Sequence, residues 1–200
     1  PALLIMIVLI FGSKNISESF TYNKIESHNP DANIFEETLS VTNIQSDVSN
    51  IERLNRWVSA LKMFQYQPHW GFGPGTYQFS YIPFQESKLM NRLSVRNPDN
   101  IPKGSGGSAH SELLLQLSEN GWPSTAIFII MFLVWIYRGY LSIGELQIRR
   151  LPFFLGLITY AFHMNVNNFL NQPGFAFLFW TFGALLMRPD LFSHKTEDES

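Results

Sequence analysis

One stretch of the chain constrains the fold more than any other, the run WPSTAIFIIMFLVWIYRGYL at Trp122–Leu141. Its centre, Ala126–Tyr137, is apolar without interruption. An amphipathic helix of a soluble protein carries a polar stripe, and this segment has none. About 20 apolar residues cross a bilayer as a helix, and Pro123 suits the first turn of one. The sequence therefore predicts a transmembrane helix that begins near Trp122.

Three further apolar stretches predict more helices of this kind. Pro1–Gly12 is too short to span a bilayer, so we expect it to be the end of a spanning helix whose first part precedes Pro1 in a longer protein. Leu151–Leu170 has the length of a span, and Gly174–Met187 is short for one, which predicts tilting or a thinner membrane region. The predicted fold class is an all-α polytopic membrane protein with a large, mostly helical or irregular loop. The alternative, a soluble protein with buried helices, is disfavoured by the uniformly apolar Ala126–Tyr137.

Composition excludes several other classes of function. The chain of 200 residues is 46% hydrophobic and 15% charged, which argues against disorder over most of its length. Its formal net charge of −2 gives no basic excess, so we expect no nucleic-acid partner. The absence of cysteine excludes a disulfide scaffold and a thiol nucleophile.

Charge distribution divides the chain into four predicted regions. Residues 13–121 hold 9 of the 14 basic residues and 11 of the 16 acidic ones, which predicts one large polar loop between apolar helices. Short basic connections stay in the cytoplasm, and Arg138, Arg149 and Arg150 flank such a connection. We therefore expect the loop to be periplasmic, in a multi-pass protein of the bacterial inner membrane. The regions are the end of a helix at 1–12, the loop at 13–121, three transmembrane helices at 122–188 and a cytoplasmic tail at 189–200.

Two helices are predicted inside the loop. Ser49–Glu52 has the pattern of a capping box, and the helix that follows should stop before Pro68. It should carry an apolar stripe of Ile51, Leu54, Val58 and Leu61. The second helix should run from Ala109 to about Asn120, with His110, Leu114, Leu117 and Gly121 on one stripe and Glu112 and Glu119 on the other side.

Three groups of residues are candidates for chemistry. Arg53 and Trp57 are four residues apart, so the guanidinium can stack on the indole and present itself to a phosphate, together with Arg56. His110 follows a glycine-rich segment at a predicted helix start, a place that favours anions. A polar cluster runs from His163 to Asn168 at the outer end of an apolar segment. Each group has a structural alternative: a solvated helix face, a helix cap, or helix–helix hydrogen bonding.

The predicted topology brings these groups to one side of the bilayer. A site at the outer membrane surface suits a substrate carried by a lipid. The chain has no P-loop, HExxH or Asp-x-Asp pattern, so we expect neither a metal nor another cofactor.

The segments RLNRWVSALKMFQYQPHWGFGPGTYQF and HSELLLQLSENGWP resemble the O-antigen ligase and polymerase family. The resemblance extends over Asn50–Met187, and Trp122-Pro123 departs from the small residues that usually follow the Glu-x-Gly of the ligases. The matching positions are Arg53, Trp57, Pro68, Gly71, Gly73, Gly75, His110, Leu114, Glu119 and Gly121.

This resemblance implies the C-terminal part of a polytopic glycosyltransferase. Its members move a glycan from an undecaprenyl-diphosphate carrier to lipid A–core, to another repeat unit or to a protein hydroxyl, and the ligases invert without a metal. It implies catalytic roles for Arg53, which would hold the diphosphate, and for His110, which would be the base or a second diphosphate contact. Residues expected to bind substrate are Arg56, Trp57, Gly73, Gly75, His163 and Asn168.

Two functional alternatives stay open on the sequence. The ligase interpretation competes with a polymerase or a protein O-oligosaccharyltransferase of the same family. A non-enzymatic transporter component is the alternative from another class. It is disfavoured because transporters usually carry ionisable groups deep in several spans, and Trp122–Leu141 and Gly174–Met187 carry none in their interiors.

Overall fold

The computed structural model describes residues 48–100, 107–144 and 148–192. Within these ranges the chain is helical and contains no strand. The predictions for 1–12, for the first part of the loop at 13–47 and for most of the tail at 189–200 concern residues outside this part of the chain. The long helices are α3 (Val48–Tyr66), α5 (Glu112–Gly144), α6 (Leu151–His163) and α7 (Pro173–Met187).

Helix α3 confirms the first helix predicted in the loop. Its residues Ile51, Leu54 and Leu61 are buried in an apolar cluster against which Val58 packs. The helix ends at Tyr66, before Pro68, and the short helices α4 (Tyr77–Ser80) and η1 (Ile82–Phe84) follow it. The polar segment therefore has a core of its own, built around α3.

Helix α5 consists of two limbs that meet at Gly121. The backbone there has φ 69° and ψ 179°, which is not helical. The amide of Trp122 donates to the oxygen of Pro68 at 2.9 Å instead of continuing the helix, and Pro123 lies in the first turn of the second limb, as predicted. The first limb, 112–120, packs with α3, and the second limb, 122–144, carries the long apolar run.

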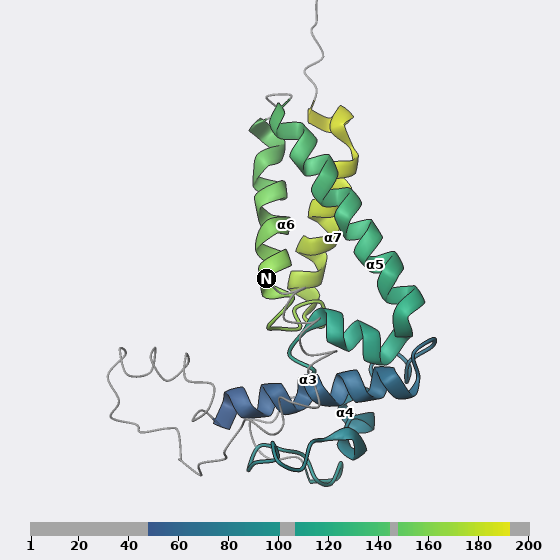
Figure 1. Ribbon diagram of the computed structural model, residues 1–200. Helices are drawn as coiled ribbons and strands as arrows, with labels where there is room; N and C mark the ends of the chain where they lie inside the picture. The colour runs from purple at the N-terminus through teal and green to yellow at the C-terminus, as the bar shows by residue number, and fades with distance from the viewer. Residues whose placement is uncertain (1–47, 101–106, 145–147, 193–200) are drawn as a thin grey trace, which may run out of the picture.

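The second limb of α5, α6 and α7 form a bundle that stands on α3 (Figure 1). By length and composition α5 can cross a membrane, whereas α6 and α7 are shorter apolar helices of 13 and 15 residues. The third predicted span, Leu151–Leu170, is thus partly wrong, because its helix ends at His163 and Met164–Asn167 form a turn.

Close packing of the bundle depends on a glycine facing an aromatic ring at each helix pair. A Cβ atom on Gly139 of α5 would collide with Phe154 of α6, one on Gly156 of α6 with Phe182 of α7, and one on Gly183 of α7 with Trp135 of α5. In a membrane no hydrophobic force drives apolar helices together. Small residues let such helices come close enough for van der Waals packing to hold them. Other faces of the bundle leave large apolar side chains exposed, among them Ile127, Ile130, Phe162 and Phe177.

One end of the bundle meets the polar part of the chain (Figure 1). The end of α6 at His163 and the beginning of α7 at Pro173 lie there, close to α3. The amide of Glu112 donates to the backbone oxygen of Met164 at 2.8 Å, which ties the start of α5 to the turn after α6. All candidate site residues therefore belong to one end of the molecule.

Candidate functional site

The backbone around His110 is the most constrained part of this region. His110 has φ 51°, and it is the one non-glycine with a positive φ among the described residues. A left-handed backbone costs a non-glycine residue about 1–3 kcal/mol and persists only where its surroundings hold it. The predicted helix start at Ala109 is therefore wrong. The helix begins at Glu112, and His110 lies in the turn before it.

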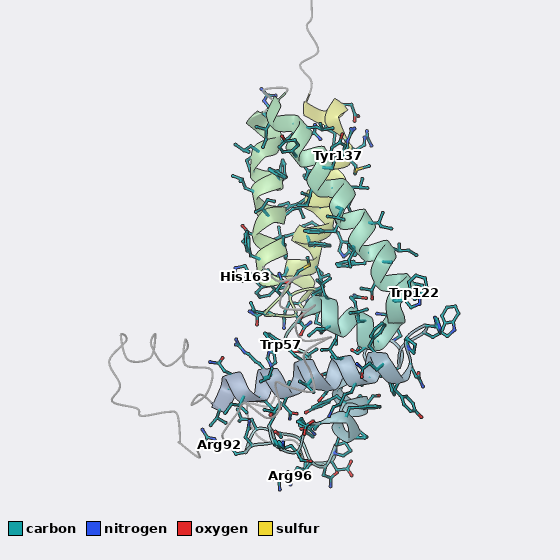
Figure 2. All side chains as sticks on the ribbon, in the orientation of Figure 1. Trp57, Arg92, Arg96, Trp122, Tyr137 and His163 are labelled. Atoms are coloured by element: carbon teal, nitrogen blue, oxygen red, sulfur yellow. The ribbon has the colours of Figure 1, made fainter. Side chains whose placement is uncertain are left out.

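Helix α3 holds this turn through two side chains. The indole Nε1 of Trp57 donates a hydrogen bond to the oxygen of His110 at 3.3 Å, and the guanidinium Nη1 of Arg56 donates to the oxygen of Ser108 at 3.0 Å. Figure 2 shows Trp57 between α3 and the end of the bundle. These contacts join two motifs that lie more than 50 residues apart in the sequence.

Arg56 is a core residue and not an exposed cation. It is 1% exposed, and its Nε forms an ion pair with Oε1 of Glu52 at 3.0 Å. Its guanidinium lies over the ring of Tyr81, 5.6 Å from the centroid. A guanidinium enclosed in this way offers little surface to a phosphate, so substrate binding by Arg56 stays a prediction that these contacts do not favour, and its hydrogen bond to Ser108 positions the turn before α5.

Arg53, one turn earlier on α3, is in a different state. It is half-buried, and within the described residues it forms no ion pair and no hydrogen bond. The expected stacking on Trp57 is absent, since the cation–ring contact found in this part of the chain is that of Arg56. Arg53 is nevertheless close enough to His110 to act on its charge. The structure thus offers a cation with spare donors whose charge acts on the imidazole.

The imidazole of His110 is neutral at physiological pH. Burial lowers its pKa from 6.5 to about 4, and the positive charges of Arg56 and Arg53 contribute further. A neutral imidazole can accept a proton from a hydroxyl group. A bound anion close to it would offset the two cations and raise the pKa, which would make His110 a stronger base when substrate is present.

The loop that contains Gly71, Gly73 and Gly75, called the glycine loop below, packs around the kink in α5. A Cβ atom on Gly71 would collide with the backbone of Glu119, and one on Gly121 would collide with the backbone oxygen of His69. The amide of Gly73 donates to the backbone oxygen of Glu119 at 2.8 Å. The amides of Gly75 and Tyr77 donate to Oε2 and Oε1 of Glu119, both at 2.9 Å.

These contacts give the loop motif a structural role. The amides of Gly73 and Gly75 already have partners, so they are not available to a phosphate group. Glu119, expected on an outer face, is 7% exposed and is used entirely in fastening the loop. Contact of Gly73 and Gly75 with substrate stays a prediction that these hydrogen bonds do not favour.

The polar cluster after α6 meets the first turn of α5 through Asn168. The amide of Asn168 lies beside the carboxyl of Glu112, and neither its nitrogen nor its oxygen has a hydrogen-bond partner in the described structure. His163 is exposed at the end of α6 and contacts the ring of Phe169. In Figure 2 His163 lies at the bundle end that faces α3. Asn168 therefore joins the site region, whereas His163 lies at its edge.

Glu112 is the residue of this region that the sequence did not single out. It is 1% exposed, although it was expected on the polar side of its helix. Burial raises the pKa of its carboxyl group. The signal in the sequence is weak: an acidic residue two positions after a histidine is common on helix surfaces.

Comparison with protein families matches residues 2–129 to the family model described as O-antigen ligase. The match covers more than half of the chain and includes Arg53, His110 and the glycine loop. It begins earlier and ends earlier than the resemblance over Asn50–Met187, so it takes in the first apolar run and leaves out α6 and α7. No curated protein and no solved structure matches the chain.

Proposed function

Because the chain belongs to the O-antigen ligase family, we propose that it transfers a glycan from an undecaprenyl-diphosphate carrier to an acceptor hydroxyl at the outer surface of the inner membrane. Family membership indicates ligase-like glycan transfer at a membrane, with a lipid-linked glycan and an acceptor as its general substrates. The finer proposal rests on the charge of Arg53, which forms no ion pair and no hydrogen bond within the described residues and which contributes to the lowered pKa of the half-buried His110 imidazole.

The reaction needs two kinds of help from the protein. The acceptor oxygen attacks the anomeric carbon, the bond from that carbon to the diphosphate oxygen breaks, and the acceptor loses its proton. Arg53 would neutralise the charge that develops on the leaving diphosphate. His110 would take the proton from the hydroxyl. A direct displacement of this kind inverts the anomeric carbon and is proposed to proceed without a metal.

Arg56 and Trp57 support this chemistry indirectly, through hydrogen bonds to the backbone of the turn that carries His110. They fix the oxygens of Ser108 and His110 to α3, so the imidazole and Arg53 are placed by one rigid helix. Displacement of a catalytic group by about 1 Å can reduce a rate 100-fold. We therefore assign Arg56 and Trp57 as positioning residues.

Membrane topology is the second element of the proposal. The exposed apolar side chains of α5, α6 and α7 suit contact with lipid or with further helices. Trp122 and Trp70 are 50% and 84% exposed near the kink, and aromatic side chains of this kind gather at membrane interfaces. We propose that this level marks the outer interface, with α3 and the loop on the periplasmic side. The four regions 1–12, 13–121, 122–188 and 189–200 keep their proposed assignments.

Deletion of the gene in its host tests the proposed activity and its alternatives. Loss of a ligase leaves polymerised glycan on the lipid carrier, and loss of a polymerase leaves single repeat units on the acceptor. Loss of a protein O-oligosaccharyltransferase leaves the surface polysaccharide intact and removes glycan from proteins. Normal glycans of all three kinds would contradict the proposal and favour a transporter component.

A further inference from the structure

A cavity of about 550 Å³ opens beside the first limb of α5. This volume lies within the range of small-molecule sites, about 300–1,000 Å³. Its walls come from the glycine loop, from Gly107 and Ser108, from α5 and from Asn171 after α6. No function considered so far uses this cavity, and neither Arg53 nor His110 lines it.

The described walls of the cavity are rich in uncharged polar groups. Four primary amides line it, and a primary amide carries both donors and an acceptor; they belong to Gln78, Gln116, Asn120 and Asn171. The Nδ2 of Asn120 already donates to Oε1 of Gln116 at 2.8 Å, and the remaining groups can bind hydroxyls. No lysine, arginine or histidine of the described chain lines the cavity. This chemistry suits a neutral ligand with several hydroxyl groups and does not suit a phosphate.

Two carboxyl groups line the same cavity, and only one has spare capacity. Both oxygens of Glu119 accept backbone hydrogen bonds, from Gly75 and Tyr77. Glu112 is 1% exposed, and its Oε2 has no hydrogen-bond partner at bonding distance in the described structure, although the amide groups of Gln116, Asn168 and Leu170 lie near this carboxyl. Leaving a buried carboxyl oxygen unsatisfied costs about 1–3 kcal/mol or more, so an incoming hydroxyl donor would relieve this cost.

We propose that the cavity binds a sugar unit of a glycan substrate, with the carboxyl group of Glu112 accepting a hydrogen bond from a sugar hydroxyl. The inference rests on the proposed glycan transfer and adds to it a subsite distinct from the diphosphate contact. The amides of Gln116 and Asn171 complete the set of hydroxyl partners. Glu112 binds substrate here and takes no proton from the reacting hydroxyl.

The position of the cavity relative to His110 supports this assignment. Ser108 and Glu112 line it, and His110 lies midway between them in the same turn. The oxygen of Ser108 is held by Arg56, and the amide of Glu112 is held by Met164. A sugar bound here would therefore lie next to the turn that carries the proposed base.

Direct binding to the full-length protein in lipid nanodiscs tests the proposal. The probes are undecaprenyl diphosphate, the repeat-unit oligosaccharide of the host and the lipid A core oligosaccharide, the last two freed from their lipids. Glu112→Gln, Gln116→Ala and Asn171→Ala are compared with Glu86→Gln, which alters a carboxyl group at the α3 surface that pairs with Lys62. Thermal unfolding of each variant confirms that it is folded.

We expect Glu112→Gln and Asn171→Ala to weaken the binding of one oligosaccharide at least tenfold. The affinity for undecaprenyl diphosphate should change less than twofold. The affected oligosaccharide identifies a donor or an acceptor subsite. Arg53→Gln should show the opposite pattern. Unchanged oligosaccharide binding in all three cavity variants, no oligosaccharide binding by the unaltered protein, or an equal loss of affinity for undecaprenyl diphosphate would each overturn the proposal. Failure of the catalytic proposal is seen separately, as normal transfer by the Arg53 and His110 variants.

Discussion

The indole nitrogen of Trp57 donates a hydrogen bond to the backbone oxygen of His110 at 3.3 Å. This contact joins the Arg-x-x-x-Trp segment of α3 to the histidine turn before α5. It places Arg53 and His110 in one electrostatic environment, in which the arginine contributes to the lowered pKa of the imidazole. Four predictions follow from the arrangement of these residues and of the helices that hold them.

Replacing Arg53 by glutamine should reduce glycan transfer at least 100-fold, because a preorganised charge at a developing anion is worth about that much. Arg92 and Arg96 are exposed arginines of the same loop, and Figure 2 shows them on the side of α3 away from the bundle. Arg92→Gln and Arg96→Gln therefore serve as matched controls and should transfer normally. The measurement is the initial rate with the lipid-linked donor, and equal losses at all three arginines would contradict a specific role for Arg53.

Acidification should destabilise the protein partly through His110. In the folded protein its pKa is about 4, whereas the unfolded chain takes up the proton near 6.5. The unfolded state therefore binds more protons in this window, and stability falls as the pH drops from about 6.5 to about 4. His110→Asn removes this titration, and asparagine tolerates the left-handed backbone. The melting temperature of the variant should fall less over this range than that of the unaltered protein; parallel curves would refute the assignment.

Arg56→Met should destabilise the fold strongly, because it leaves Glu52 buried without its cation. Breaking a buried pair in this way costs about 3–5 kcal/mol. The surface pair of Lys62 and Glu86 is the control, since Lys62→Met should cost about 0–1 kcal/mol. Denaturant unfolding in detergent compares the two variants. A small effect of Arg56→Met would contradict the view that the buried ion pair stabilises this part of the fold.

Gly71 and Gly75 offer a second matched pair. Both have positive φ, 62° and 75°, so alanine is strained at either position. Only at Gly71 would the added Cβ meet the backbone of Glu119, since nothing lies within 4 Å at Gly75. Gly71→Ala should therefore lower the melting temperature more than Gly75→Ala does. Equal losses would mean that backbone strain, and not the close approach of the loop to α5, requires these glycines.

The apolar pattern was sufficient to predict the helices but not their interruptions. The helix at Trp122–Leu141 and the stripe on α3 were predicted correctly as helices because a long apolar run and a period of 3.6 residues are both visible in the sequence. The early end of α6 at His163 left no such mark, because residues of the following turn include Met164 and Val166. A polar cluster at the end of an apolar run is compatible with a helix or with a turn.

The burial of charged side chains is the main feature that the sequence did not predict. Glu112 and Glu119 were placed opposite the apolar stripe by helical periodicity, and Arg56 was expected to face a substrate, yet each of the three is buried. Their partners lie far away in the chain: Ser108 for Arg56, and Gly75 and Tyr77 for Glu119. Long-range pairing of this kind follows from the packing of α3, the loop and α5, which a single sequence does not display.

The most direct test of the central claim is a double-mutant cycle between Arg53 and His110 in the full-length protein. Arg53→Gln, His110→Asn and the double variant are compared by single-turnover transfer from the undecaprenyl-diphosphate-linked donor. If both side chains act on one diphosphate-bearing substrate, the double variant should lose at least tenfold less than the product of the single losses. Losses that multiply independently, or single variants that transfer at the normal rate, would contradict the account.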